Sequence, residues 1–304
     1  MDETTARLGE DPLAPDWVPP EIDTTKAHPA RIYDFFLGGK DHFDVDRQAG
    51  EVVLKVIPTA REMVRENRAF LGRAVRHLAE AGITQFLDIG TGIPGPGNTG
   101  DVARSINPDA RVVYVDYDPS AVAHSRRLLA GNPDAGVVLA DMRDSAAVLG
   151  HPVTRALLDF DRPIGLLMVS VLHFIPSTDD PFGMVARYRD AVAPGSYLTI
   201  SHATHEASPG AAADVERLYA STARTSAYTR SHAEITRFFA GSDLVEPGVV
   251  YLPLWHPRSP EPPEHPERAW FYAGVGRLRG AAEAAGAGAG EAGTAQPAQP
   301  EASH

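Results

Sequence analysis

Three short apolar runs, each with an aspartate at or near its carboxyl end, place the strongest constraint on the fold of this 304-residue chain. The first run, 86–89, contains Asp88 and leads into the glycine- and proline-rich stretch 90–97. The other two runs end at Asp116 and Asp141. In an open α/β sheet the carboxyl ends of parallel strands share one edge, and ligands bind there. We therefore expect the three carboxylates at one edge, beside a glycine loop whose backbone approaches a ligand closely.

Strand-like and helical patterns alternate after residue 83. We expect strands at 84–90, 111–116, 136–141, 163–171 and 196–202, and helices at 99–106, 119–130, 144–158 and 181–193. Further helices are expected at 211–224 and 231–240, and two last strands at 249–254 and 270–277. Short links between the elements indicate right-handed crossovers and a parallel sheet with helices on both faces. One of the last two strands is expected to run antiparallel.

The chain before the first strand forms a helical addition, which we expect at 26–82. Pro29 opens a short amphipathic helix that ends at Gly38, and a longer helix ends at Gly82. The sheet does not need these helices, so we expect 27–46 to act as a lid that closes over the ligand. The remaining parts are expected to be a flexible acidic tail at 1–25, a ligand-binding domain at 83–280 and a disordered alanine- and glycine-rich tail at 281–304.

Composition excludes several classes of protein. The chain has no cysteine, which excludes disulfides and thiolate metal sites. It has no apolar run near the roughly 20 residues that span a bilayer, and its N-terminus lacks the apolar core of a secretory signal. We expect a cytoplasmic protein without a membrane partner. Most of the net charge of −12 lies in the two tails, and the nearly balanced body lacks the basic surface of a nucleic-acid-binding protein.

The loop Gly90-Thr-Gly-Ile-Pro-Gly95 satisfies the dinucleotide fingerprint G-x-G-x-x-G, yet two features disfavour a nicotinamide or flavin. Pro94 and Pro96 flank the third glycine and suit an extended loop, whereas in the fingerprint this glycine lies where a helix points its N-terminus at pyrophosphate. Asp88, two residues before the loop, is unfavourable beside pyrophosphate and suits an ammonium group. The pattern therefore indicates a cofactor without phosphate.

S-adenosylmethionine (SAM) has the required chemistry, because it carries an ammonium group, two ribose hydroxyls and an adenine amine. We expect Asp116 to accept hydrogen bonds from both hydroxyls and Asp141 to accept one from the amine. The backbone N–H of Met142 would then meet a ring nitrogen of adenine.

The set formed by Asp88-x-Gly-x-Gly92, Asp116 and Asp141 resembles the Rossmann-like class I methyltransferases. The resemblance implies an α/β fold with a seven-stranded, mostly parallel sheet in the order 3-2-1-4-5-7-6, strand seven being antiparallel. It also implies that the glycine loop packs against the methionine part of SAM. The expected cofactor-binding residues are Asp88, Gly90, Thr91, Gly92, Asp116, Tyr117, Asp141, Met142 and Ser170.

Four segments narrow the resemblance. They are 27–43, 171–176, 195–202 and 245–249, and they are similar to an actinomycete family of SAM-dependent methyltransferases long catalogued as a domain of unknown function. The similarity runs from about Ile22 to Arg279, which makes 83–280 the SAM-binding domain. It implies no particular methyl acceptor.

Few residues are needed for the chemistry, since methyl transfer depends chiefly on proximity and alignment. His173 follows the fourth strand and is a candidate general base; alternatively it caps the strand or packs on the cofactor. Tyr33 of the N-terminal addition, with Arg31, is a candidate contact for the methionine carboxylate or the acceptor; alternatively it is a packing residue.

A metal site and a nucleic-acid substrate are both disfavoured. His202, His205 and Glu206 lie at the end of the fifth strand, but a strand does not bring residues i and i+3 together, and no third ligand is evident. We expect no metal. The Asn/Asp-Pro-Pro-aromatic tetrapeptide of enzymes that methylate amino groups on bases is missing after the fourth strand, at 170–176.

The sequence therefore predicts a SAM-dependent methyltransferase that acts on a small-molecule acceptor. Two alternatives from other classes stay open at this point: a SAM-binding regulatory protein of the same fold, and a nicotinamide-dependent oxidoreductase. The acceptor atom, the use of a base and the oligomeric state do not follow from the sequence.

Overall fold

The computed structural model of the chain describes residues 22–223, 225–257, 261 and 263–279. The predicted tail 281–304 and most of the predicted tail 1–25 lie outside the described residues. The helices are α2 (Pro29–Leu37), α3 (Asp44–Val56), α4 (Ala60–Glu80), α5 (Thr99–Ile106), α6 (Pro119–Leu129), α7 (Ser145–Gly150), α8 (Pro152–Leu157), α9 (Pro181–Asp190), α10 (Pro209–Thr222) and α11 (His232–Arg237). The strands are β1 (Gln85–Ile89), β2 (Arg111–Asp116), β3 (Ala135–Leu139), β4 (Gly165–Val169), β5 (Tyr197–Ala203), β6 (Ser242–Leu244), β7 (Val250–Tyr251) and β8 (Phe271–Leu278).

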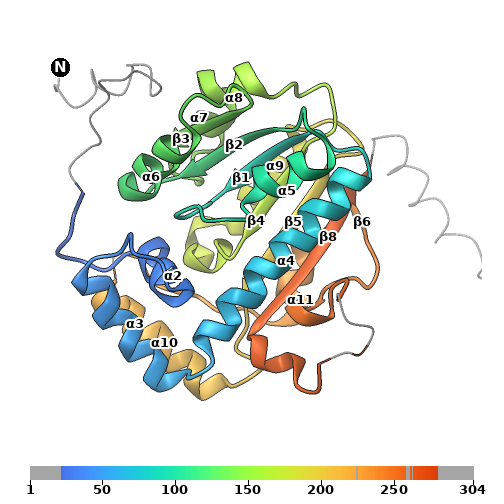
Figure 1. Cartoon of the computed structure of the whole chain (residues 1–304). Coiled ribbons are helices and arrows are strands. Elements are labelled where there is room, and N and C mark those ends of the chain that lie inside the picture. The colour runs from blue at the N-terminus through green and yellow to red at the C-terminus, as the bar shows by residue number, and fades with distance from the viewer. Residues whose placement is uncertain (1–21, 224, 258–260, 262, 280–304) are drawn as a thin grey trace, which may run out of the picture.

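The described strands form one sheet in the order β3-β2-β1-β4-β5-β8-β6, and β7 also pairs with β8 (Figure 1). Strands β1 to β5 are mutually parallel, and β8 runs antiparallel to β5. The chain therefore moves outward from β1 to β3 and then returns to β4 on the other side of β1. This is the order that the resemblance implies, with β8 as the antiparallel strand, and the predicted α/β fold class is confirmed.

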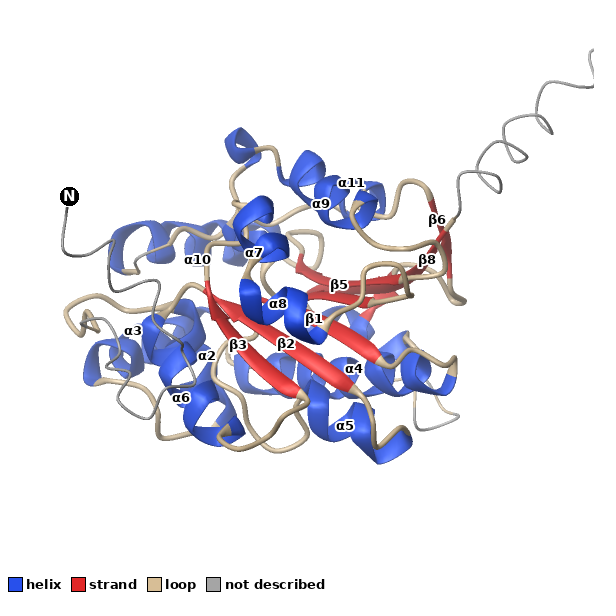
Figure 2. Cartoon of the chain, turned by 90° about the horizontal axis from the view of Figure 1, so that it is seen from above, coloured by secondary structure: helices blue, strands red, loops and turns tan. Residues whose placement is uncertain are grey.

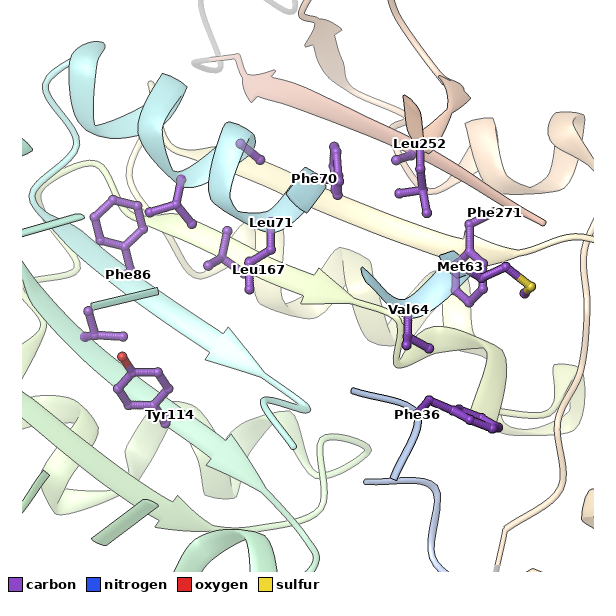
Figure 3. Close-up of a cluster of buried hydrophobic side chains, with 14 of the residues drawn as sticks. Phe36, Met63, Val64, Phe70, Leu71, Phe86, Tyr114, Leu167, Leu252 and Phe271 are labelled. Atoms are coloured by element: carbon purple, nitrogen blue, oxygen red, sulfur yellow. The ribbon is translucent and has the colours of Figure 1, made fainter. Parts of the chain in front are cut away.

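Alternate strand residues pack on two different layers of helices. Phe86 and Tyr114 belong to the core on the side of α4, α5 and α6, whereas Leu87 and Val113 belong to the core on the side of α7, α9 and α11 (Figure 2). Figure 3 shows the first of these cores, with Leu71 of α4 packed over the sheet. Because both faces are covered, β1 and most of β2 are buried along their length.

Local signals set the starts of several helices. The first residue of α2, α6, α8, α9 and α10 is proline, which has no N–H to leave unpaired there. Asp118 caps α6 by accepting a hydrogen bond from Ser120 N at 3.1 Å. The predicted capping box of Ser231 and Glu234 opens α11.

Two predicted elements differ from the structure, and one strand was not predicted. The predicted helix 144–158 consists of α7 and α8, because Pro152 interrupts the hydrogen bonding and pushes His151 into an extended conformation. The predicted strand 249–254 is reduced to β7, followed by the 3₁₀ turn Leu252–Leu254. The edge position of the sheet is taken by β6, which the sequence analysis missed.

The N-terminal addition contains one helix more than predicted, α3. Its buried residues Ala49 and Val53 lie one turn apart and pack into the core that includes α2. Helices α2, α3 and α10 gather beyond the carboxyl ends of the central strands, where α3 and α10 lie side by side (Figure 1). No helix in the described part of the chain is long and apolar enough to cross a bilayer.

Candidate active site

A cavity of about 630 Å³ lies between the carboxyl ends of β1 to β5 and the helices α2, α4 and α10. Its position matches the rule for open α/β sheets, because the strand order reverses between β1 and β4. Its volume lies within the ~300–1,000 Å³ typical of ligand pockets. All the predicted site residues line it, namely Tyr33, Asp88, Gly90, Thr91, Gly92, Asp116, Tyr117, Asp141, Met142, Ser170 and His173.

The glycine loop after β1 takes a conformation that only glycine adopts easily. Gly90 has φ +73° and Gly92 has φ +64°. A Cβ atom on Gly90 would also lie 2.3 Å from Cγ2 of Val171 in the loop after β4. The loop contains no helical residue before Asn98 caps α5, in agreement with the expectation from the flanking prolines. The helix therefore begins well beyond the glycines and does not open beside Gly95, as it would in the dinucleotide fingerprint.

Two buried carboxylates lie at the ends of β1 and β2. Asp88 Oδ2 accepts a hydrogen bond from Thr99 Oγ1 at 2.6 Å, and Asp116 accepts from Gly92 N at 2.7 Å and from Asp118 N at 2.9 Å. Burial raises the pKa of Asp88 and of Asp116 to about 6 in each case. A ligand that brings positive charge or hydrogen-bond donors would favour the ionised forms.

Asp141 lies at the mouth of the cavity and forms an ion pair that the sequence analysis did not predict. Arg143 Nη2 is 2.5 Å from Asp141 Oδ2, and Arg143 Nη1 is 3.0 Å from Asp179 Oδ2. Partial burial raises the pKa of Asp141, but the hydrogen bonds and charge of Arg143 outweigh this effect and lower it. Next to it, the N–H of Met142 donates no hydrogen bond within the described part of the chain. A donor–acceptor pair is thus available beside the cavity.

The imidazole of His173 is buried without a hydrogen bond to any described residue. Its ring centroid lies 5.4 Å from that of Phe271 and 5.6 Å from that of His202. Burial and the charge of Arg230 lower the pKa of His173 to about 3. The imidazole is therefore uncharged at neutral pH, and it can donate a hydrogen bond to a ligand or accept one from it.

Arg230, which the sequence analysis missed, fixes the loop that carries His173. Its buried guanidinium donates to Leu172 O at 3.1 Å and to Ile175 O at 2.8 Å. It also lies 2.7 Å from Nε2 of His202, whose Nδ1 is 2.7 Å from Ala203 O. Both ring nitrogens of His202 are thereby engaged within the protein.

Tyr33 belongs to a chain of hydrogen bonds that ties α2 to the sheet. Its hydroxyl donates to Val64 O at 3.0 Å and accepts from Asn67 Nδ2 at 2.9 Å. Asn67 Oδ1 accepts from Ser201 Oγ at 2.6 Å, and Ser201 Oγ accepts from Ser170 N at 2.9 Å. Burial raises the pKa of Tyr33, so the phenol stays protonated. This arrangement favours the packing interpretation of Tyr33.

Arg31 does not line the cavity, and Arg68 takes the place expected for it. Arg31 is buried and donates to the backbone oxygens of Asp23 and Lys26. Arg68 of α4 lines the cavity, and its Nη2 lies 4.0 Å from the position of a Cβ on Gly95. Within the described residues it makes no hydrogen bond or ion pair. A charged residue within a predicted helix gave no signal from which this position could be predicted.

The predicted absence of a metal site concerns His202, His205 and Glu206, whose side chains have other partners. Glu206 accepts hydrogen bonds from Tyr272 Oη at 2.9 Å and from His232 N at 3.0 Å. Among the described residues, no group of three or more histidines and acids is placed to hold a metal ion.

The far wall of the cavity is apolar. Phe36, Met63, Val64 and Phe271 come together there from α2, α4 and β8 (Figure 3). Tyr219 of α10 is also part of this wall. The cavity thus has a polar end at the strands and an apolar end under the helices.

The polar end fits SAM by the chemistry of its donors and acceptors. Asp88 and Asp116 supply buried carboxylates for an ammonium group and for ribose hydroxyls. Asp141 and the Met142 N–H supply an acceptor and a donor for adenine. Arg68, which forms no hydrogen bond or ion pair with the described residues, supplies a cation that suits the methionine carboxylate. None of these matches between protein and cofactor involves a phosphate group.

Comparison with known proteins agrees with the family that the sequence resembles. The family model for S-adenosyl methyltransferases matches residues 15–279. A crystal structure of a candidate methyltransferase from Thermobifida fusca YX is 44% identical, with a TM-score of 0.81, and the match covers 87% of this chain and 100% of that one. A DUF574 family protein from Streptomyces avermitilis MA-4680 is 42% identical, with a TM-score of 0.80, over 85% of this chain and 100% of that one. No curated protein matches the chain.

The match covers the helical addition, the sheet and the cavity, and the fold and the donor set agree with it. The chain therefore belongs to the S-adenosyl methyltransferase family and is a SAM-dependent methyltransferase with a Rossmann-like α/β fold.

Proposed function

We propose that this enzyme methylates a small molecule, which binds at the apolar end of the cavity. The observation that supports the proposal is the division of one cavity into a polar end, which suits SAM, and an end lined mainly by apolar side chains such as Phe36, Met63 and Phe271. The cavity is enclosed by α2, α4 and α10, so a small acceptor fits there better than a nucleic acid. The nearly balanced charge of the body also argues against a nucleic-acid substrate.

We assign the polar end to the cofactor residue by residue. Asp88 would hold the ammonium group, Asp116 the ribose, and Asp141 with Met142 the adenine. Arg68 would bind the carboxylate. The remaining proposed contacts are Gly90, Thr91, Gly92, Tyr117 and Ser170, all of which line the same end of the cavity.

When bound, SAM would supply a methyl group whose carbon is attacked in line by an electron pair of the acceptor, while the bond from that carbon to sulfur breaks and S-adenosylhomocysteine leaves. The chain contributes alignment and exclusion of water. His173 is our candidate for the residue that contacts the acceptor, because its neutral ring has no hydrogen-bond partner in the described protein and lines the cavity. The low pKa of His173 makes it a weak base, so we assign it a hydrogen bond that orients the acceptor. Tyr33 would act on the site through Asn67 and Ser201.

The N-terminal addition, 26–82, is proposed to complete the site, with 27–46 as a lid. A Cβ on Gly92 would lie 3.9 Å from Cβ of Ala30, so α2 sits directly on the glycine loop. Nδ1 of His28 lies 3.1 Å from Asp118 Oδ2, which joins the same segment to the loop after β2. We further propose that the enzyme is cytoplasmic.

Calorimetry followed by a transfer assay tests the proposed function. SAM and S-adenosylhomocysteine (SAH) should bind, and NAD should give no heat. Radiolabelled SAM incubated with fractionated small-molecule extracts should then label a compound of low molecular mass. Label that appears only in protein or nucleic acid would refute a small-molecule acceptor. Tight binding of SAM without any labelled product would favour a regulatory role.

A further inference from the structure

One face of helix α10 lines the apolar end of the cavity. The residues of this face are Ala212, Val215, Glu216 and Tyr219, which follow each other at the spacing of one side of a helix. Three of them are uncharged. Glu216 therefore adds a carboxylate to a helix face that is otherwise uncharged, and none of the proposed contacts to SAM involves it.

Glu216 is held in a defined orientation. Its Oε1 accepts hydrogen bonds from Thr229 N at 2.7 Å and from Thr229 Oγ1 at 2.6 Å. Its Oε2 has no hydrogen-bond partner among the described residues, and the carboxylate forms no ion pair with them. One oxygen is thus fixed by neutral donors while the other stays available for a ligand.

The segment that holds Glu216 is fastened to the proposed site of methyl transfer. Tyr228 N donates to the backbone oxygen of His173 at 2.7 Å, and Thr229 is the next residue. Tyr219 lies one helical turn after Glu216, and its ring is 5.9 Å from that of Phe174, the neighbour of His173. The hydroxyl of Tyr219 has no partner among the described residues. Glu216 and His173 therefore belong to the same end of the cavity.

A carboxylate in such surroundings limits the ligands that can bind. It accepts hydrogen bonds and donates none when ionised. A partly buried charge is unfavourable unless a cation or donors compensate it. A ligand carboxylate in the same place would be repelled.

We propose that Glu216 determines the class of methyl acceptor: an apolar molecule with an amino or hydroxyl group that donates a hydrogen bond to Oε2. This inference rests on the proposed function, since it assumes that the apolar end holds the acceptor. It assigns Glu216 to recognition, not to the chemical step. Acceptors whose polar group is a carboxylate should be excluded.

Three probes with one skeleton test the proposal: 3-phenylpropylamine, 3-phenylpropan-1-ol and 3-phenylpropanoate. Each is titrated by calorimetry into the full-length protein, with and without saturating SAH. The amine or the alcohol should bind at least about 10-fold more tightly than the carboxylate, the size of effect expected for a charge-assisted hydrogen bond. Preference for the amine would identify a cationic head group, and preference for the alcohol a neutral one.

Glu216→Gln removes the charge but keeps an acceptor oxygen for Thr229, so the fold should be retained. In this variant the amine and the alcohol should bind only slightly more tightly than the carboxylate probe. Asp214→Asn is the matched control, because it removes an acid from the same helix that pairs at the surface with Arg217 and does not line the cavity. The control should bind all three probes as the wild type does.

The proposal is overturned if the carboxylate binds as tightly as the other two probes, if neither the amine nor the alcohol binds at millimolar concentration, or if Glu216→Gln leaves the order unchanged. Failure of the proposed function is a separate result, because it would appear in the transfer assay as label only in protein or nucleic acid, whereas these titrations compare small molecules in the presence and absence of SAH. Normal SAH binding with the wrong order of probes would contradict only the role of Glu216.

Discussion

Burial and a bound ligand are expected to shift the pKa values of Asp88 and Asp116 in opposite directions. Burial raises the pKa of each to about 6, because a charged carboxylate loses hydration there. The folded state then binds protons more tightly than the unfolded state. The stability that these two groups contribute is present at low pH and is lost as the pH rises through about 6. Ligand binding should reverse this preference.

Affinity for SAH should therefore rise with pH. The ammonium group and the ribose hydroxyls favour ionised carboxylates, so over the range from pH 5 to pH 8 the dissociation constant should fall as the pH rises and should level off above about pH 6. Calorimetry over this range measures it. Asp116→Asn should bind SAH more weakly at neutral pH and with a shallower pH dependence. An affinity that is flat across the range would show that neither carboxylate faces the ligand.

Arg68 should contribute to SAH binding through the carboxylate of its amino-acid part. Arg68→Ala should raise the dissociation constant by about 10- to 150-fold, which corresponds to the roughly 1.5–3 kcal/mol of a hydrogen bond to a charged group. Binding of 5′-methylthioadenosine, which lacks the amino acid, should not change. Arg65→Ala, an exposed position on the same helix, is the control. Equal losses for both ligands would place Arg68 elsewhere in the site.

At the scale of elements, the hydrogen-bond chain from α2 through α4 to β5 predicts what Tyr33 does. Tyr33→Phe removes two hydrogen bonds and leaves the ring in place, so the free energy of unfolding should fall by about 1–2 kcal/mol, measured by urea denaturation. SAH affinity should stay near the wild-type value. A variant of full stability whose methyl transfer is slower by about 100-fold or more would instead make Tyr33 a catalytic group.

Strand ends were easier to predict than helix faces. Asp116 ends an apolar run, and that local signal places it at the sheet edge in any parallel α/β fold. Arg68 and Glu216 lie on helices, where a charged residue normally marks the solvent side. Arg68 and Glu216 line the cavity only because α4 and α10 pack over the strand ends. Their participation could not be predicted from spacing.

Errors in the predicted elements have similar causes. Pro152 lies within an apolar pattern that continues on both sides, and the pattern concealed the break between α7 and α8. Strand β6 has three residues and is mostly exposed, so it lacks the alternation that marks a half-buried strand. It forms because β8 offers a free edge, which is a property of the assembled sheet.

For the whole molecule, the order of the strands was predicted from the resemblance to a known family. The position of the acids at the strand ends was predicted from the residues themselves. The N-terminal addition was predicted to close over the ligand, but the residues that α4 contributes to the cavity were not predicted. It precedes β1 in sequence, yet α2 and α4 reach across the carboxyl ends of the strands and supply Tyr33, Asn67 and Arg68 to the cavity. The part of the chain that the sheet does not need is therefore the part that encloses the ligand.

This enclosure implies that the addition responds to the cofactor. If 27–46 is a lid, its amides should exchange with deuterium more slowly when SAH is bound, because the bound form holds α2 on the loops after β1 and β2. Gly38, with φ +81°, ends α2 and provides a joint for this motion. Helix α8 is the internal control, since it packs against β2 and β3 and does not line the cavity. Protection limited to the strand-end loops, with 27–46 unchanged, would mean that the addition is a fixed wall.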